Sequence, residues 1–210
     1  MRYSVISYIT QKQKKEPPQM ESAPANKHEQ QVSFFTAELV DKTKDALSKQ
    51  LHTEWRDGIQ TGFEANGQSP DTPRLRASKD STGEADAEWF AEQEAAGVEF
   101  PTDDNGNKLI NTNVAYEDLP PSWKNANIGA ANFVVDNIVE DSKTGKDVVN
   151  DDYIEGLSSR IHDQWMEDNS WQKDQTPELF VPYDDLPESE KAKDRDHVLL
   201  ALDALTSPEA

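Results

Sequence analysis

Apolar side chains recur every four residues along two separate stretches of the chain. In the first stretch the repeating positions are Phe35, Leu39, Thr43, Leu47, Leu51 and Trp55. This spacing follows one face of an α-helix of about five turns, and alternation along a strand would not produce it. Ser33 or Thr36 is suited to cap the start of this helix, and Gly58 is suited to end it.

A second stretch, which opens at Asp151, repeats the design. Its repeating positions are Tyr153, Leu157, Ile161 and Trp165. The segment LSSRIHDQW, which ends at Trp165, aligns with the segment LSKQLHTEW, which ends at Trp55. In both helices a His, His52 or His162, stands three residues before the Trp. The chain therefore contains two copies of one helix design.

A Tyr-acid-Asp-Leu-Pro motif also occurs twice, in VAYEDLPPSWK from Val114 and in VPYDDLPESEK from Val181. Pro is favoured in the first turn of a helix, so each motif predicts a short extended segment leading into a helix. The structural positions of the motif are Asp118, Leu119, Pro120, Asp185, Leu186 and Pro187. We expect the two Asp side chains to accept backbone N–H groups at the helix starts. Lys124 and Lys191 are expected to pair with these acids or with the Tyr-bearing segments.

These patterns predict a mainly α protein built from two tandem units related by an approximate two-fold axis, with short β segments in the connectors. Residues 1–31 are read as a flexible tail, because they hold few large apolar side chains. Residues 32–141 form the first unit and include a long inserted connector at about 56–113. Residues 150–207 form the second unit, and we expect the two units to pack as one domain.

The inserted connector carries its own local signals. The segment AEWFAEQEAAGVEF predicts a short helix, and the Asn-Gly pair of TDDNGNKLI predicts a turn between short strands. Long insertions within compact domains are often functional, so this connector is the natural place for specificity.

Charge and composition exclude several classes of partner. The 210 residues carry a formal charge of −20, although residues 1–31 carry +2 from five Lys/Arg and three Asp/Glu. Such an acidic chain repels phosphate backbones and anionic lipid, so we expect no direct nucleic-acid partner and no membrane partner. The chain has no Cys, and no apolar run approaches the length of a transmembrane helix. We therefore expect a cytoplasmic protein.

No enzyme signature is complete. HTE at His52 lacks the Cys pair of a zinc deaminase, no His-Glu-x-x-His is present, and DDNGNK near Asp103 has no acid at either end of a calcium loop. We expect no catalytic residue, no metal and no cofactor. An alternative is a hydrolase that uses connector acids such as Asp80, Glu84 or Asp86. A second alternative is an acidic nucleic-acid mimic that binds a basic protein.

With both motifs in view, the chain resembles the RyR domain, a module repeated in ryanodine receptors and also found as stand-alone bacterial and phage proteins. The first unit matches at His52, Trp55, Arg56, Tyr116, Asp118, Leu119, Pro120, Lys124 and Asn127. The second unit matches at His162, Trp165, Pro182, Tyr183, Asp185, Leu186, Pro187, Lys191, Asp194 and Arg195. The first unit departs from the family pattern at Ala115, where Pro is usual, and only Trp171 resembles the Gly-Trp-x-x-Gly that follows the first helix.

The resemblance implies a non-enzymatic binding or scaffold module, including a sensor of a small ligand or nucleotide, with an unknown protein or small molecule as partner. The candidate ligand or interface residues are His52, Trp55, Arg56, Tyr116, Lys124, His162, Trp165, Tyr183 and Lys191. The two His either hydrogen-bond to the motif or form a paired ligand site. The two Trp either pack in the core or offer a stacking platform. We expect the functional surface where the two His-x-x-Trp helices and the two Tyr-x-x-Leu-Pro segments meet, with residues 56–113 decorating that site or forming a second one.

Overall fold

The computed structural model describes residues 35–80, 83–170, 173–174 and 176–207. The predicted tail, Ser33 and Trp171 lie outside these residues. Within the described part, the chain is mainly helical, as predicted. The α-helices are α2 (Ala37–Ala65), α3 (Ala87–Ala95), α4 (Pro121–Lys143), α5 (Asp151–Asp168) and α6 (Glu188–Thr206).

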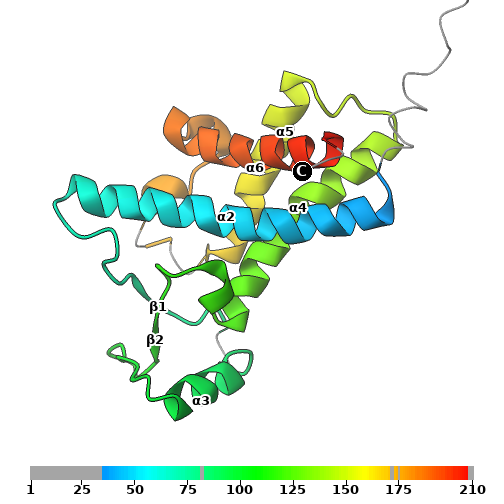
Figure 1. Cartoon of the computed structure of the whole chain (residues 1–210). Coiled ribbons are helices and arrows are strands. Elements are labelled where there is room, and N and C mark those ends of the chain that lie inside the picture. Colours follow the sequence, from blue (N-terminus) through cyan, green and yellow to red (C-terminus); the bar gives the residue numbers. More distant parts are fainter. Residues whose placement is uncertain (1–34, 81–82, 171–172, 175, 208–210) are drawn as a thin grey trace, which may run out of the picture.

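The four long helices pack around one hydrophobic core (Figure 1). Helix α4 runs back along α2, since Lys44 contacts Asp136 and Trp55 contacts Trp123 further along. Helix α6 packs against α5 and also contacts α2 and α4. The core draws on all four helices and on the α4–α5 turn; its buried members are Leu47, Leu51, Ala131, Val134, Val135, Ile138, Val139, Val148, Leu157, Ile161, Val198, Ala201, Leu202 and Leu205.

The inserted connector forms a small lobe beside the helices (Figure 1). Strand β1 (Leu75–Ala77) pairs antiparallel with β2 (Leu109–Asn111), with Arg76 opposite Ile110. The predicted connector helix is present as α3, where Phe90 packs between Trp89 and Phe100. The predicted Asn-Gly turn is present, because Gly106 has φ +82° and the single bridge between Thr102 and Lys108 closes it. The strand partner of β2 is the distant β1, however, so the turn does not join the two strands of the sheet.

Helix α2 begins as predicted and ends later than predicted. The Thr36 hydroxyl accepts the Leu39 N–H at 3.1 Å, which caps the first turn. The helix then continues through Gly58 to Ala65 and ends at Asn66, followed by Gly67 with φ +72°. The prediction that Gly58 ends α2 is wrong. A helix-interior Gly costs only about 1 kcal/mol, and a long, packed helix tolerates that cost.

Replacing Gly58 with Ala is expected to stabilise the protein by about 0.5–1 kcal/mol, because Ala loses less backbone entropy in a helix. A Cβ added at Gly58 meets no atom within 4 Å, so packing does not oppose the change. The midpoint of urea unfolding followed by circular dichroism measures the effect. The matched change Gly67→Ala is expected to destabilise, because an L-residue is strained at φ +72°. Stabilisation by both changes would contradict this account.

Candidate functional site

In the first unit, His52 joins helix α2 to the Tyr-acid-Asp-Leu-Pro motif. Its side chain is buried, and Nε2 lies 2.8 Å from the Val114 carbonyl oxygen. A carbonyl oxygen only accepts, so Nε2 carries the proton and donates it. Burial chiefly, reinforced by the positive charge of Arg56, lowers the pKa of His52. The ring is therefore neutral at pH 7 and holds the chain in place.

The second unit repeats this arrangement. His162 is buried, and its Nε2 donates to the Val181 carbonyl oxygen at 2.9 Å. Its ring stacks on Trp165 at 5.9 Å between centroids, as His52 stacks on Trp55 at 5.6 Å. The Tyr of each motif also lies beside the His ring. The ring centroids are 6.2 Å apart for Tyr116 and His52 and 6.3 Å apart for Tyr183 and His162. Both His therefore hydrogen-bond to the motif, which is one of the two roles expected for them; the other was a paired ligand site.

The two Leu-Pro bends have matching backbones. Tyr116–Asp118 and Tyr183–Asp185 each form one 3-10 turn, and the following Leu has φ −67° in both, with ψ 147° at Leu119 and 148° at Leu186. A Lys side chain closes each turn: Lys124 Nζ donates to the Glu117 carbonyl at 2.6 Å, and Lys191 Nζ donates to the Asp184 carbonyl at 2.7 Å. Both Lys thus bind the Tyr-bearing segment, one of the two partners expected for them.

The expected capping role of Asp118 and Asp185 is wrong. Both side chains are exposed, and the cap positions of α4 and α6 are held by Pro120 and Pro187, which have no side-chain cap bond. At the start of α4 the acceptor is instead Asp86, whose Oδ1 accepts the Ser122 N–H at 2.8 Å. Pro120 has no side-chain oxygen to accept the Ser122 N–H, so Asp86 of the connector accepts it instead.

Asp86 is the best-enclosed acid of the connector. It is fully buried, and its Oδ2 accepts hydroxyl hydrogen bonds from Ser122 at 2.6 Å and from Ser78. Asp80 accepts the Ala85 N–H at 2.8 Å, and Glu84 is exposed. The three acids thus lie in different settings, and Asp86 anchors the lobe to α4. Among the described residues, no group of three or more His, Cys, Asp or Glu is arranged to hold a metal ion.

The two Trp differ in their surroundings beyond the shared His. Arg74 of the connector lies over the Trp55 ring, with its Cζ 4.6 Å from the centroid, and Trp123 lies beside Trp55. Trp165 instead contacts Phe180 at 5.2 Å. With His52 and Arg74 both against its ring, Trp55 serves packing, and a stacking platform at this ring would require Arg74 to move.

The ring contacts of the two His-x-x-Trp pairs stay within their own units. Those of His52 and Trp55 lie within the first unit, and those of His162 and Trp165 lie within the second. The units instead join where α6 packs on α2 and α4 and where α5 packs on α4. Among the described residues, no hydrogen bond or ring contact joins the two His, so a paired His site stays a prediction.

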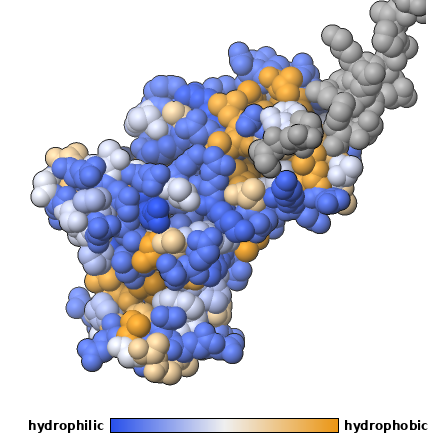
Figure 2. Space-filling model, in the orientation of Figure 1, coloured by the Kyte–Doolittle hydropathy of each residue, from blue (hydrophilic) through white to orange (hydrophobic). Residues whose placement is uncertain are grey.

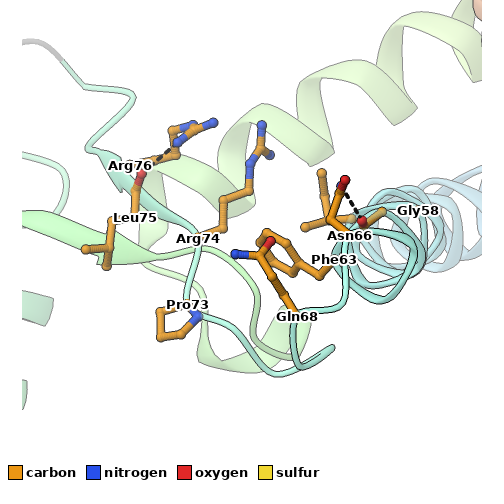
Figure 3. Close-up of a pocket in the computed structure, with 10 residues that line it drawn as sticks. Gly58, Phe63, Asn66, Gln68, Pro73, Arg74, Leu75 and Arg76 are labelled. Atoms are coloured by element: carbon orange, nitrogen blue, oxygen red, sulfur yellow. Dashed lines mark hydrogen bonds between the residues drawn. The ribbon is translucent and has the colours of Figure 1, made fainter.

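A groove lies between the last turns of α2 and β1, within the stretch of about 56–113 that the sequence marks as the natural place for specificity (Figure 3). It is open to solvent and has a volume of about 460 Å³. Its lining is Gly58, Ile59, Gly62, Phe63, Asn66, Gln68, Pro73, Arg74, Leu75 and Arg76. Of the predicted site residues, Trp55 touches this groove's lining through Arg74. We call this feature the Arg74 groove.

Arg56, the remaining candidate of the first unit, is partly buried on α2. Its Nε is buried and has no hydrogen-bond partner among the described residues. Its charge acts on His52, whose pKa it lowers, so it supports the neutral state of that ring.

Comparison with known proteins adds no assignment. No family model matches the chain, and no curated protein or solved structure is detectably similar to it. No described helix is both long and apolar enough to cross a lipid bilayer. The geometry of the chain itself is therefore the evidence on its function.

Proposed function

We propose that this protein is a non-enzymatic binding module of the RyR type, which acts as a scaffold or as a sensor of a small ligand. The duplicated His, Trp, Tyr and Lys side chains build the framework, because each makes the same internal contact in both units. The binding surface is then the part that only the first unit has, the Arg74 groove.

The observation that carries this proposal is the state of Arg74. Its guanidinium is half-buried on Trp55, and among the described residues no carboxylate forms an ion pair with it, in a chain with 41 acids and 21 Lys/Arg. A partly buried charge without a counter-charge is costly, and such groups concentrate at binding sites.

A thermal-shift screen with nucleotides, sugar phosphates and phosphorylated peptides tests the sensor form. At least one compound is expected to raise the melting temperature of the wild-type protein by a few degrees, since a ligand that binds only the folded state stabilises it by mass action. Arg74→Gln is expected to abolish most of this shift. Lys143→Gln, which removes a positive charge from the far end of α4, is expected to leave it unchanged.

If no compound stabilises the protein and a protein partner is captured instead, the scaffold form is supported. Turnover of any of these compounds by the purified protein would contradict a non-enzymatic role. The screen therefore separates the two forms of the proposal from each other and from the hydrolase alternative.

A further inference from the structure

Resting on the proposed function, we infer that the Arg74 groove binds an oxyanion, a carboxylate or a phosphate, carried by a small organic ligand with an apolar body. The groove, its charge and its lining each contribute to this inference.

The Arg74 guanidinium is held in place before any ligand arrives. Its Cζ lies over the Trp55 ring, 4.6 Å from the centroid, and His52 stacks on the same Trp. Its backbone is fixed at both ends, because the Arg74 N–H donates to Asn111 Oδ1 at 3.0 Å and its carbonyl accepts the Thr112 N–H at 2.9 Å. A guanidinium donates in its own plane, so stacking leaves those donors directed to the side. Such a fork fits the two oxygens of a carboxylate or phosphate.

The local charge also favours an anion. Burial, together with the positive charge of Arg76, lowers the pKa of Arg74 to about 10, so Arg74 stays protonated at pH 7. Arg76 donates to the Leu75 carbonyl at 2.8 Å, and among the described residues it forms no ion pair with a carboxylate either. Two cations thus line one groove of an acidic protein. An anion placed between them would offset their mutual repulsion.

The shape of the groove limits the rest of the ligand. Ile59 and Phe63 supply apolar surface, and Gln68 adds an amide beside Phe63 (Figure 3). Because the groove is open and modest in volume, it suits a small molecule or the end of a larger one. An aromatic or short aliphatic acid would place its anion at Arg74 and its body on Phe63.

The second unit lacks this site, which predicts the stoichiometry. Phe180 contacts Trp165 where Arg74 covers Trp55, and the long connector that supplies Arg74 is absent there. Each chain should therefore bind one ligand. On the face shown in Figure 2, hydrophilic residues cover much of the surface, and hydrophobic residues gather at the upper right and on the lower lobe.

Nuclear magnetic resonance titration of the full chain with benzoate, phenyl phosphate and neutral benzamide tests the inference. Benzoate or phenyl phosphate is expected to shift the Trp55 indole and Arg74 side-chain signals with one saturable site per chain, and benzamide is expected to bind at least tenfold more weakly. A stronger response to benzoate identifies a carboxylate ligand, and a stronger response to phenyl phosphate identifies a phosphate ligand. Arg74→Lys keeps the charge but loses the fork, and it is expected to weaken binding several-fold; Arg74→Gln is expected to weaken it at least tenfold.

Circular dichroism of each variant verifies its fold, and Lys143→Gln serves as the charge control. If neither anion moves the Trp55 or Arg74 signals at millimolar concentration, the inference is overturned. If a compound from the thermal-shift screen stabilised wild type and Arg74→Gln equally, the role as a non-enzymatic binding module would still stand, but its placement at the Arg74 groove would be wrong, because that ligand would bind elsewhere. Equal binding of benzamide and benzoate would likewise overturn the anion assignment.

Discussion

Replacing Asp86 with Ala is expected to lower the free energy of unfolding by about 3–5 kcal/mol, because it leaves several buried hydrogen-bond donors without an acceptor. Asp86 is fully buried and accepts from the Ser122 N–H, the Ser122 hydroxyl and the Ser78 hydroxyl. These donors come from the start of α4 and from the connector next to β1. The carboxylate therefore holds the lobe on the helices. The Ala side chain offers these donors no acceptor in its place.

Urea unfolding followed by Trp fluorescence measures this loss, and hydrogen exchange locates it. Exchange in β1, β2 and the first turn of α4 is expected to speed up more than exchange in α5 and α6. Asp86→Asn keeps one acceptor and is expected to cost about half as much. Glu88→Ala, which changes an exposed acid two residues away, is the matched control and is expected to change stability by less than about 0.5 kcal/mol. If Asp86→Ala were as mild as Glu88→Ala, the anchoring role would be wrong.

Local patterns in the sequence predicted the helices because the information is local. A four-residue spacing from Phe35 to Trp55 specifies a helix with one buried face, and the second series from Tyr153 does the same. The paired motifs predicted two similar bends, and the backbone angles at Leu119 and Leu186 agree closely. Where a pattern is repeated within one chain, each copy supports the reading of the other.

Long-range contacts were not predictable in this way. The pairing of β1 with β2 joins strands of three residues across a long insertion, and neither strand is long enough to show a period. Asp86 stands in a polar segment whose composition indicates solvent exposure, yet it is buried by partners as far away as Ser122. The position of Arg74 on Trp55 is of the same kind. The candidate site therefore became visible only when distant segments were brought together.

The paired contacts also explain why the predicted ligand residues hold the chain together and are not free for a ligand. In each unit the His uses Nε2 to donate to a carbonyl at the start of the motif, as His52 and His162 do. The Lys of each unit, Lys124 or Lys191, uses Nζ to donate to a carbonyl of the 3-10 turn within the motif. A contact that both units need for folding appears in both sequences. A site that only one unit carries produces no repeated sequence motif. The Arg74 groove is such a site, because its residues occur only in the first unit.

The free energy of unfolding is expected to decrease as the pH rises from about 4 to about 7, because of Asp194. Burial, assisted by the nearby Glu190 carboxylate, raises the pKa of Asp194 from 3.8 to about 7, against an opposing effect of Lys193. Its Oδ2 lies 3.7 Å from His162 Nδ1. With Nε2 donating to Val181, a proton on Asp194 Oδ2 would lie between that oxygen and His162 Nδ1.

The sign follows from proton binding. Between pH 4 and pH 7 the folded protein keeps the Asp194 proton, whereas the unfolded chain has released it. The folded state thus binds more protons, and this group makes the free energy of unfolding fall by up to about 1.4 kcal/mol per pH unit across the window. Asp194→Asn removes the titration, and at pH 8 it is expected to be about 2–4 kcal/mol more stable than the wild type. At pH 4 the two proteins are expected to differ by less than about 1 kcal/mol.

The first unit shows that an amide is tolerated here. Asn127 occupies the corresponding place three residues after Lys124, as Asp194 stands three residues after Lys191. Its Nδ2 donates to the Trp123 carbonyl at 2.9 Å. Urea unfolding of the wild type and Asp194→Asn at pH 4, 5, 6, 7 and 8 gives the difference curve, with Asp196→Asn on the exposed side of α6 as the control. Parallel curves for the wild type and Asp194→Asn would show that Asp194 keeps its ordinary pKa in the folded protein.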